Sequence, residues 1–372
     1  MLEAGRTGRS STRYSPFMPR FRADVSRISP YTPGRPIADV AAEYGFDPTT
    51  VVKLASNESP LPPFPAVQQV MAESILETNR YPDNDCLDLR RAIAGKLDVA
   101  TEAIWVGGGS SELLRVIGIA VGGLGTSAVY AWPSFIIYRL ASIIGMSEPI
   151  EIALAEGHRH DLDGMLAAIR PDTTVVYVCN PNNPTGSHLS GSEISAFLRA
   201  VPEGVLVVID EAYHEYVTAP DYESAIPLVQ EHRNVVVTRT FSKVFGLAAL
   251  RVGYGVAAPE VIVELRKAQA PFTVAAMGQA AAIEALRHPA ELAARVADNA
   301  RGREQIEAGL AERSIEFVSS QANFVYFRMG RSTADTTTSL LHHGVIVRPF
   351  GDGWVRVSVG TEEENARFIA AL

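Results

Sequence analysis

Short apolar segments and longer amphipathic segments alternate through the centre of the chain. The apolar segments are rich in β-branched residues, which predicts buried strands, and they lie at 104–106, 127–131, 174–179, 205–210, 235–239 and 252–256. Helical periodicity lies between them, as at residues 161–170, where Asp163 is expected to help cap the helix. This alternation predicts an α/β fold in which helices cover both faces of a mostly parallel sheet.

The pattern changes near residue 277. A long segment rich in Ala, Leu, Arg and Glu comes first, and strand-like segments follow at 323–327, 345–347 and 354–359. This order predicts a smaller α+β domain over residues 276–372. A chain of 372 residues is also longer than the roughly 150 residues of a typical domain.

The first 27 residues differ in composition from the rest of the chain. They hold six arginines, several serines and only two acids, Glu3 and Asp24. This composition is similar to that of a transit peptide, but the segment has no convincing apolar stripe and no apolar core of a secretory signal. We therefore expect a disordered extension, or translation from an upstream start codon.

Charge and residue usage exclude several classes of function. A net charge of −9 gives no attraction for nucleic acid or an anionic membrane surface. No apolar run approaches the roughly 20 residues of a membrane span. Two cysteines, Cys86 and Cys179, form no disulfide framework, so we expect a cytoplasmic protein. The histidine clusters lack the spacing of metal ligands, so we expect no metal site.

The string Thr240-Phe-Ser-Lys243-Val-Phe-Gly carries the strongest chemical signal. It follows a predicted strand, so Lys243 can point into a site at the strand's end and, when neutral, form a Schiff base with an aldehyde cofactor. Arg251, eight residues later, offers a planar charged group to a phosphate on that cofactor. A surface lysine is the simpler interpretation of Lys243 alone, but three further strings favour a site.

These three strings each follow or end a predicted strand. The turn Asn180-Pro-Asn-Asn183-Pro-Thr-Gly186 places Asn183 at a strand's carboxyl end, where ligands bind in open α/β sheets. Asp210 ends an apolar strand, where a buried carboxylate requires a cationic partner or a catalytic role, unless it only caps a helix. The turn Gly107-Gly-Gly109-Ser110 precedes a helical pattern, so its amides and hydroxyls suit an anion. No Gly-Lys-Ser/Thr follows these glycines, which excludes an ATP loop.

Taken together, the strings resemble the fold-type I pyridoxal-phosphate aminotransferases, within them the histidinol-phosphate aminotransferases and their aromatic aminotransferase relatives. The resemblance covers about residues 28–372, and the further strings that carry it are Lys53-Leu-Ala-Ser-Asn57-Glu-Ser-Pro, Arg80-Tyr81-Pro-Asp, Asp210-Glu-Ala-Tyr213, Leu250-Arg251-Val-Gly-Tyr, Gln321-Ala-Asn323-Phe and Val355-Arg356-Val-Ser-Val-Gly360. It implies the aspartate aminotransferase-like fold, with a large cofactor-binding domain over 57–275. Residues 28–56 would join the small domain.

The resemblance also implies residue roles, with Lys243, Asp210 and Tyr213 as the catalytic residues. Lys243 would bind pyridoxal 5'-phosphate covalently and later carry a proton between substrate and cofactor. Asp210 would pair with the ring nitrogen, so that the ring can accept electrons. At the cofactor ring, Phe135 would stack on the ring face, and Asn183 and Tyr213 would contact the ring oxygen. The residues around the phosphate would be Gly109, Ser110, Thr240, Ser242 and Arg251. The protein would be a homodimer in which Tyr81 of the other subunit also reaches this phosphate.

Arg356 matches the family's arginine for the substrate carboxylate, and Asn57 and Asn323 fall in strings that line the substrate side. Tyr31 and Arg348 match positions that contact the phosphate of histidinol phosphate, although aromatic-specific relatives carry similar strings. We therefore expect a transaminase that moves the amino group of histidinol phosphate or of an aromatic amino acid to 2-oxoglutarate. The route would be ping-pong, through pyridoxamine phosphate.

Three alternatives remain open at this point. A lyase of the same fold, such as an amino-acid-phosphate decarboxylase, would share the cofactor strings but release carbon dioxide. A catalytically silent regulator that binds the cofactor usually carries an added DNA-binding module, and the first 27 residues cannot hold a helix-turn-helix. A nucleotide-binding α/β domain would require Gly-x-Gly-x-x-Gly after its first strand, and this chain lacks that motif there.

Overall fold

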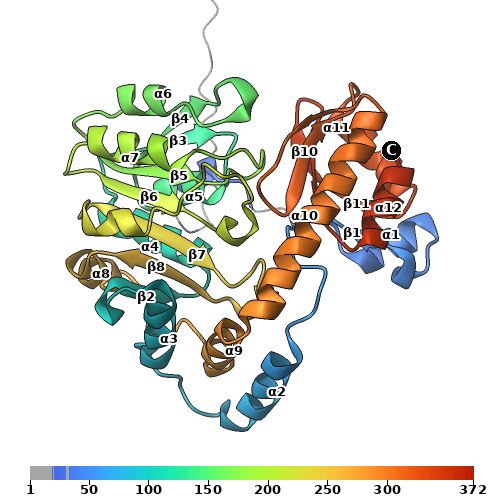
Figure 1. The fold of residues 1–372 in the computed structure, drawn as a ribbon. Coiled ribbons are helices and arrows are strands. Elements are labelled where there is room, and N and C mark those ends of the chain that lie inside the picture. The colour runs from blue at the N-terminus through green and yellow to red at the C-terminus, as the bar shows by residue number, and fades with distance from the viewer. Residues whose placement is uncertain (1–18, 20, 31–32) are drawn as a thin grey trace, which may run out of the picture.

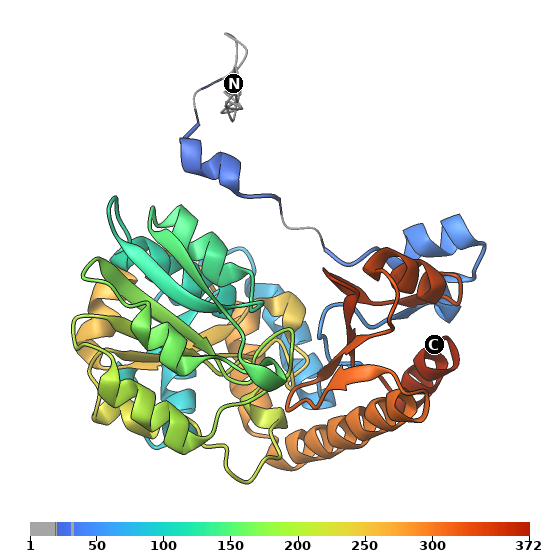
Figure 2. The same ribbon diagram turned by 90° about the horizontal axis from the view of Figure 1, so that it is seen from above.

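The computed structural model describes residues 19, 21–30 and 33–372, in which the chain forms a large and a small body. Figure 1 shows them side by side, with the long helix α10 (Pro289–Glu312) running from one to the other. The N-terminal α1 (Ile37–Tyr44) and β1 (Val52–Lys53) lie with the C-terminal elements in the small body, as Figure 2 also shows. Tyr31 lies outside the described residues.

The large body is built on a seven-stranded sheet in the order β2-β8-β7-β6-β5-β3-β4. Strand β8 is antiparallel to both of its neighbours, and the other pairs are parallel. The strands are β2 (Ile104–Gly107), β3 (Ser127–Trp132), β4 (Glu148–Ala153), β5 (Thr173–Cys179), β6 (Leu206–Asp210), β7 (Val235–Thr240) and β8 (Gly253–Ala257). In register, Cys179 pairs with Asp210 and Asp210 with Thr238, so three parallel strands end side by side.

Helices cover both faces of this sheet, as the alternation in the sequence predicts. On β5, Val176 and Val178 pack into one core, whereas Val175 and Tyr177 face the other. The first core is completed by residues of α2 (Pro65–Ser74), α3 (Leu87–Leu97), α6 (Leu162–Ala167), α7 (Gly191–Ala200) and α9 (Ala276–Leu286). The second core is completed by residues of α4 (Ser110–Val121), α5 (Ile137–Ile144) and α8 (Pro259–Arg266). The α/β prediction is therefore confirmed.

Two local features differ from the expectations. Strand β4 was not predicted, because it lies at the sheet edge, alternates between half-buried and exposed residues, and contains Pro149. The expected cap Asp163 is wrong: Asp161 caps α6, with its carboxylate accepting from the backbone N–H of Gly164 at 2.9 Å.

The small body holds a four-stranded antiparallel sheet in the order β12-β13-β10-β9 and a parallel pair of β1 with β11. Its core forms where α10 and α12 pack against the strands. Its remaining elements are β9 (Glu316–Val318), β10 (Phe324–Arg328), α11 (Thr333–Leu341), β11 (Val345–Ile346), β12 (Arg348–Gly351), β13 (Trp354–Ser358) and α12 (Glu362–Ala370). Shorter 3-10 helices occur at Ala23–Arg27, Pro48–Thr50, Ile75–Glu77, Thr101–Ala103, Glu156–His158, His214–Tyr216, Pro227–Gln230 and Ala248–Leu250.

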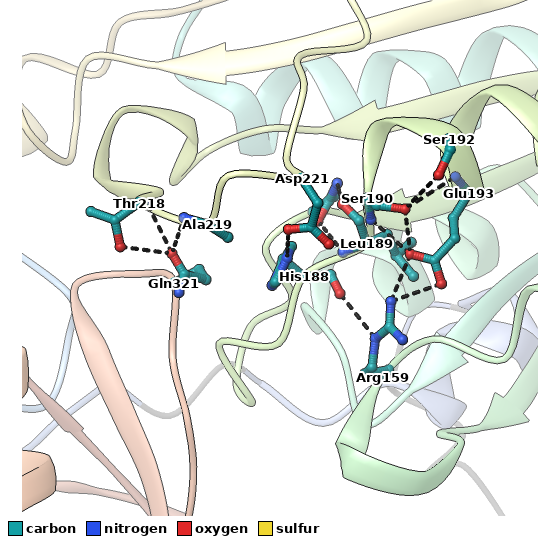
Figure 3. A network of polar contacts seen from close by, with 11 residues as sticks. Arg159, His188, Leu189, Ser190, Ser192, Glu193, Thr218, Ala219, Asp221 and Gln321 are labelled. Atoms are coloured by element: carbon teal, nitrogen blue, oxygen red, sulfur yellow. Dashed lines mark hydrogen bonds and ion pairs between the residues drawn. The ribbon is translucent and has the colours of Figure 1, made fainter.

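Gln321, just before β10, ties the two bodies together close to the sheet's carboxyl edge. Figure 3 shows its side chain reaching the loop at Thr218 and Ala219, whose backbone N–H groups donate to its Oε1 at 2.8 and 3.1 Å. The backbone N–H of Gln321 also donates to the carbonyl oxygen of Gly186 at 2.8 Å. The Asn/Pro-rich turn of the large body is thereby fixed to the small one.

Candidate active site

Most of the predicted residues gather where β5, β6 and β7 end. Asn183 follows β5, Asp210 is the last residue of β6, and Lys243 follows β7. Ligands bind at this edge of parallel α/β sheets. Arg356 reaches the same place from β13 of the small body, as its contact with Asn183 shows.

Asp210 is 1% exposed, and its hydrogen-bond donors are neutral, namely two hydroxyls and the backbone N–H of Ala212. Its Oδ2 accepts from Tyr138 at 2.8 Å, and its Oδ1 accepts from Thr238 at 3.2 Å. Burial raises the pKa of Asp210 to about 6, against the hydrogen bonds from Tyr138, Thr238 and the backbone N–H of Ala212, which lower it. A protonated ring nitrogen would be a fitting partner for a carboxylate in this setting.

Lys243 points toward Asn57, whose carbonyl oxygen accepts from Nζ at 3.1 Å. Nζ also lies 5.5 Å from the centre of the Tyr213 ring. Burial, reinforced by the positive charge of Arg356, lowers the pKa of Lys243 to about 8. A neutral amine, which Schiff-base chemistry requires, is therefore far more accessible here than on an ordinary lysine.

Asn57 links the site to the small body. Its backbone has a left-handed φ of 54°, and its backbone N–H donates to Ser358 Oγ at 2.8 Å. Its side-chain amide donates to the Tyr213 hydroxyl at 3.0 Å, and its carbonyl oxygen also accepts from the Asn323 amide at 3.1 Å. Asn57 thereby gathers Lys243 and Asn323 at its backbone carbonyl and Tyr213 at its side-chain amide.

Arg356 is fixed between the two bodies. Its Nη2 donates to the carbonyl oxygen of Ala55 at 2.9 Å, and its Nη1 donates to the Asn183 side chain. The guanidinium carbon lies 5.2 Å from the Phe324 ring centre and 5.3 Å from that of Phe350. These contacts hold a planar cation in place, which suits recognition of a carboxylate or phosphate.

An anion cradle forms where β2 leads into α4. Gly109 precedes α4 with φ 86°, and a Cβ at this position would collide with the Arg251 guanidinium. Arg251 Nη1 donates to Ser242 Oγ at 3.2 Å, and Ser242 Oγ accepts from Thr240 Oγ1 at 2.9 Å. Backbone N–H groups at a helix N-terminus, hydroxyls and a guanidinium fit a phosphate group.

A cavity of about 470 Å³ opens between the bodies beside these residues. Four of the predicted residues line it, namely Phe135, Asn183, Arg348 and Arg356. The remaining lining residues are Arg27, Ile28, Ser29, Pro30, Trp132, Pro133, Ser134, Ile136, Arg139, Leu140, Ile143, Pro349 and Phe350. Arg22, from the segment that lines one side, donates through Nη2 to the carbonyl oxygens of Ile143 and Ile144, both at 3.2 Å, at the end of α5. Tyr81, by contrast, is 82% exposed and stacks on Phe272 at 4.7 Å between ring centres.

A buried ion pair lies directly behind the site. Arg239 donates to Glu211 Oε2 from Nε at 2.9 Å and from Nη2 at 2.7 Å, and Nη2 also donates to Ser224 at 2.7 Å. Glu211 follows Asp210, and Arg239 lies on β7 shortly before Lys243. The pair thus fixes the ends of the two strands that carry these residues.

Sequence reasoning missed Tyr138, Thr238 and Ser358, which hold Asp210 and Asn57. Thr238 is the β7 residue in register with Asp210, and Ser358 ends β13. Tyr138 lies three residues after Phe135, so the two fall on one side of a helical turn. That spacing was the available signal for Tyr138, whereas the register of β6 with β7 could not be deduced from the strings.

The family model for aminotransferases of class I and II matches residues 49–372. The chain belongs to this family. The histidinol-phosphate aminotransferase of Halalkalibacterium halodurans is 41% identical to it, over 95% of this chain and 96% of the relative. The aromatic amino acid aminotransferase of Thermobifida fusca is also 41% identical, over 94% of this chain and 96% of the relative.

Among solved structures, the histidinol-phosphate aminotransferase from Sinorhizobium meliloti in complex with pyridoxal 5'-phosphate superposes with a TM-score of 0.87. It is 28% identical, and the match covers 95% of this chain and 97% of that one. The predicted fold, the aminotransferase class and the cofactor pyridoxal 5'-phosphate are confirmed. The residues described above fit that cofactor, with a carboxylate for its ring nitrogen, a lysine for its aldehyde and a cradle for its phosphate.

Among the helices that the structure describes, none combines the length and apolar character of a membrane span. Within the same residues, no cluster of three or more His, Cys, Asp or Glu side chains is arranged to hold a metal ion.

Proposed function

We propose that this aminotransferase takes the amino group of histidinol phosphate and passes it to 2-oxoglutarate in a ping-pong reaction, as a step of histidine biosynthesis. The supporting observation is that Arg348 and Arg356 line one cavity together with Asn183 and Phe135. Two guanidinium groups beside a cofactor site can bind a phosphate ester in one half-reaction and a dicarboxylate in the other. Relatives named histidinol-phosphate aminotransferases support this choice.

We infer the following roles for the chain's own residues. The bound cofactor supplies a ring that accepts electrons from the substrate's Cα–H bond. Lys243 would hold the cofactor and, when neutral, take the proton from Cα. Asp210 would keep the ring nitrogen protonated, and the hydroxyl of Tyr213 would hold the ring oxygen with Asn183. Phe135 would stack on the ring, while Gly109, Ser110, Thr240, Ser242 and Arg251 would hold the phosphate.

On the substrate side, Arg356 would bind the carboxylate of 2-oxoglutarate, and Arg348, with Tyr31, would bind the phosphate of histidinol phosphate. Asn57 and Asn323 would line the site beneath Lys243, since the Asn57 carbonyl oxygen accepts from both Lys243 Nζ and the Asn323 amide.

The test is a single-turnover measurement. Enzyme loaded with cofactor is mixed with histidinol phosphate or with phenylalanine, and the absorbance of the bound cofactor is followed. Much faster conversion by histidinol phosphate, with the original spectrum restored by 2-oxoglutarate, is expected. Histidinol phosphate carries no carboxylate, so the lyase is tested on phenylalanine. Release of carbon dioxide from phenylalanine, in place of glutamate formation, would favour the lyase.

An aromatic amino donor is the second candidate, and the cavity wall favours it. Trp132, Phe135 and Phe350 line the cavity, and flat aromatic surfaces suit a phenylalanine side chain. Arg348→Ala separates the two candidates, because a charge-assisted contact is typically worth about 1.5–3 kcal/mol, or about 10- to 150-fold in kcat/KM. A loss confined to histidinol phosphate supports the first candidate, and equal losses for both donors remove Arg348 from substrate choice. Arg139→Ala, which removes another arginine of the same cavity, controls for a general loss of positive charge.

We further propose a homodimer in which Tyr81 reaches the cofactor phosphate of the partner subunit. Support comes from exposed apolar side chains near Tyr81: Ile75 is 58% exposed, Leu76 86% and Phe272 42%. Such a group of exposed apolar residues marks an interaction surface. Mixing Tyr81→Ala with Lys243→Ala subunits should create hybrid dimers with one complete site and restore activity. No restoration, in hybrids shown to form, would contradict the shared site.

A further inference from the structure

Tyr138 is a buried residue beside Asp210 that none of the roles above includes. It is 0% exposed, lies on α5, and donates its hydroxyl hydrogen to Asp210 Oδ2 at 2.8 Å. The contact joins residues 72 positions apart, from a helix on one face of the sheet to the end of its central strand β6.

A neighbouring tyrosine shows that this contact is more than aromatic packing. Tyr177 on β5 is equally buried and stacks on Tyr138 with 5.0 Å between ring centres and 16° between planes. Its hydroxyl nevertheless has no hydrogen-bond partner within the part of the chain that the structure describes. Of two stacked phenols, one is directed at the carboxylate and the other is not.

Tyr138 also touches the residue expected to stack on the cofactor. Its ring meets Phe135 edge-to-face, with 5.8 Å between centres and 88° between planes. The segment that leads into α5 therefore places the Phe135 ring at the cavity, and the first turn of α5 places the Tyr138 hydroxyl at Asp210.

The hydrogen bond leaves the carboxylate able to bind a further donor. Each carboxylate oxygen offers two lone pairs. Tyr138 takes one on Oδ2 and Thr238 one on Oδ1 of Asp210, and the backbone N–H of Ala212 is a third donor, which leaves a lone pair for another. Besides Tyr138, the titratable groups whose charges act on Asp210 or respond to it are Cys179 at the end of β5, Glu211 and Tyr213 beyond β6, and Lys243 beyond β7. Burial favours the neutral acid at this position, and a hydrogen-bond donor opposes it.

We propose that Tyr138 is a positioning residue, whose hydroxyl keeps Asp210 ionised and turned so that its free lone pairs face the cofactor's ring nitrogen. This inference rests on the proposed role of Asp210. Without the hydroxyl, the carboxylate becomes the stronger base and draws the proton away from the ring nitrogen, which weakens the ring as an electron acceptor.

The test compares Tyr138→Phe with Tyr177→Phe, which removes the adjacent hydroxyl without touching Asp210. In cofactor-free protein, the infrared C=O stretch of protonated Asp210, identified by its loss in Asp210→Asn, is followed against pH. A hydrogen bond to a charged group is typically worth about 1.5–3 kcal/mol, so Tyr138→Phe should raise the midpoint by about 1–2 pH units. Tyr177→Phe should leave it in place.

The loaded enzyme provides a second readout. Tyr138→Phe should lower kcat by about 10- to 100-fold, with a smaller change in KM. Introducing 3,5-difluorotyrosine at position 138, a stronger donor of the same shape, should move the infrared midpoint in the opposite direction. This variant also keeps the test decisive if Tyr138→Phe does not fold.

An unchanged midpoint in both position-138 variants would overturn the inference. The proposed role of Asp210 is tested separately by Asp210→Asn. If that variant keeps full activity, the role of Asp210 fails, whereas an inactive Asp210→Asn beside a fully active Tyr138→Phe refutes the role of Tyr138 alone.

Discussion

Replacing Arg239 by methionine should destabilise the protein by several kcal/mol, although Arg239 lies outside the substrate cavity. The side chains of Arg239 and Glu211 are 6% and 1% exposed. Removing the arginine leaves the Glu211 carboxylate buried with hydrogen bonds from Ser224, at 2.9 Å, and the Ala225 N–H, at 2.6 Å, and with His214 Nδ1 at 3.9 Å. Breaking a buried ion pair from one side costs about 3–5 kcal/mol, because the remaining charge is uncompensated.

The chain contains a matched control for this prediction. Arg328 donates to Glu316 with the same two distances, 2.9 and 2.7 Å, but these side chains are 43% and 52% exposed. Exposed pairs are worth about 0–1 kcal/mol, so Arg328→Met should have little effect. Burial is the main difference between the two pairs, since their Arg–Glu distances are the same; in addition, Arg239 donates to Ser224 and Arg328 lies 5.3 Å from the Trp354 ring centre.

Calorimetry of cofactor-free protein at one fixed concentration provides the assay, because bound cofactor and association both shift the transition. At about 2.1 cal/mol/K per residue, a chain of 372 residues has an unfolding entropy of about 0.8 kcal/mol/K. Arg239→Met should then lower Tm by about 4–6 °C, and Arg328→Met by about 1 °C or less. Adding Glu211→Gln to Arg239→Met should recover part of the loss, because it removes the buried charge. A double variant no more stable than Arg239→Met would refute the reasoning.

Three further predictions concern the lysine and a glycine. Lys243→Ala should lack the absorbance of lysine-bound cofactor, and a normal spectrum in that variant would reject Lys243 as the attachment point. Burial and Arg356 lower the pKa of Lys243 to about 8, so the neutral amine is populated above that pH. Covalent loading of cofactor-free protein with the cofactor should therefore rise through about pH 8, and the midpoint should be higher in Arg356→Met. A rise only near the ordinary lysine pKa of about 10.4 would contradict the shift. Gly186→Ala should lower Tm, because Gly186 has φ 76° and the new Cβ would meet Ser320 of the small body. Gly204→Ala is the control, because Gly204 has open space around it. Equal Tm values for the two variants would argue against the contact.

The sequence predicted those features that local pattern determines. Strands β5, β6 and β7 are buried on both faces, so they appear as continuous β-branched runs, and the polar residues that follow them mark the site's edge. Edge strand β4 carries no such run and was missed. Contacts between distant segments were also missed, because no local signal records that Tyr138 meets Asp210 or that Ser358 meets Asn57. Family strings supplied Asn57 and Arg356 as candidates, and the structure adds what holds them.

The bond between Asn57 and Ser358 has a consequence for how the enzyme is made. These residues are 301 positions apart, and Ser358 ends the last strand of the chain. On the ribosome, Asp210 and Lys243 emerge long before β13, which also carries Arg356. Until β13 pairs with β10, Asn57 lacks the Ser358 contact that fixes its carbonyl beneath Lys243. A nascent or truncated chain that ends before β13 thus carries the reactive lysine in an incomplete site. The enzyme can therefore process substrate only after the C-terminal residues of the chain have been synthesised and β13 has paired.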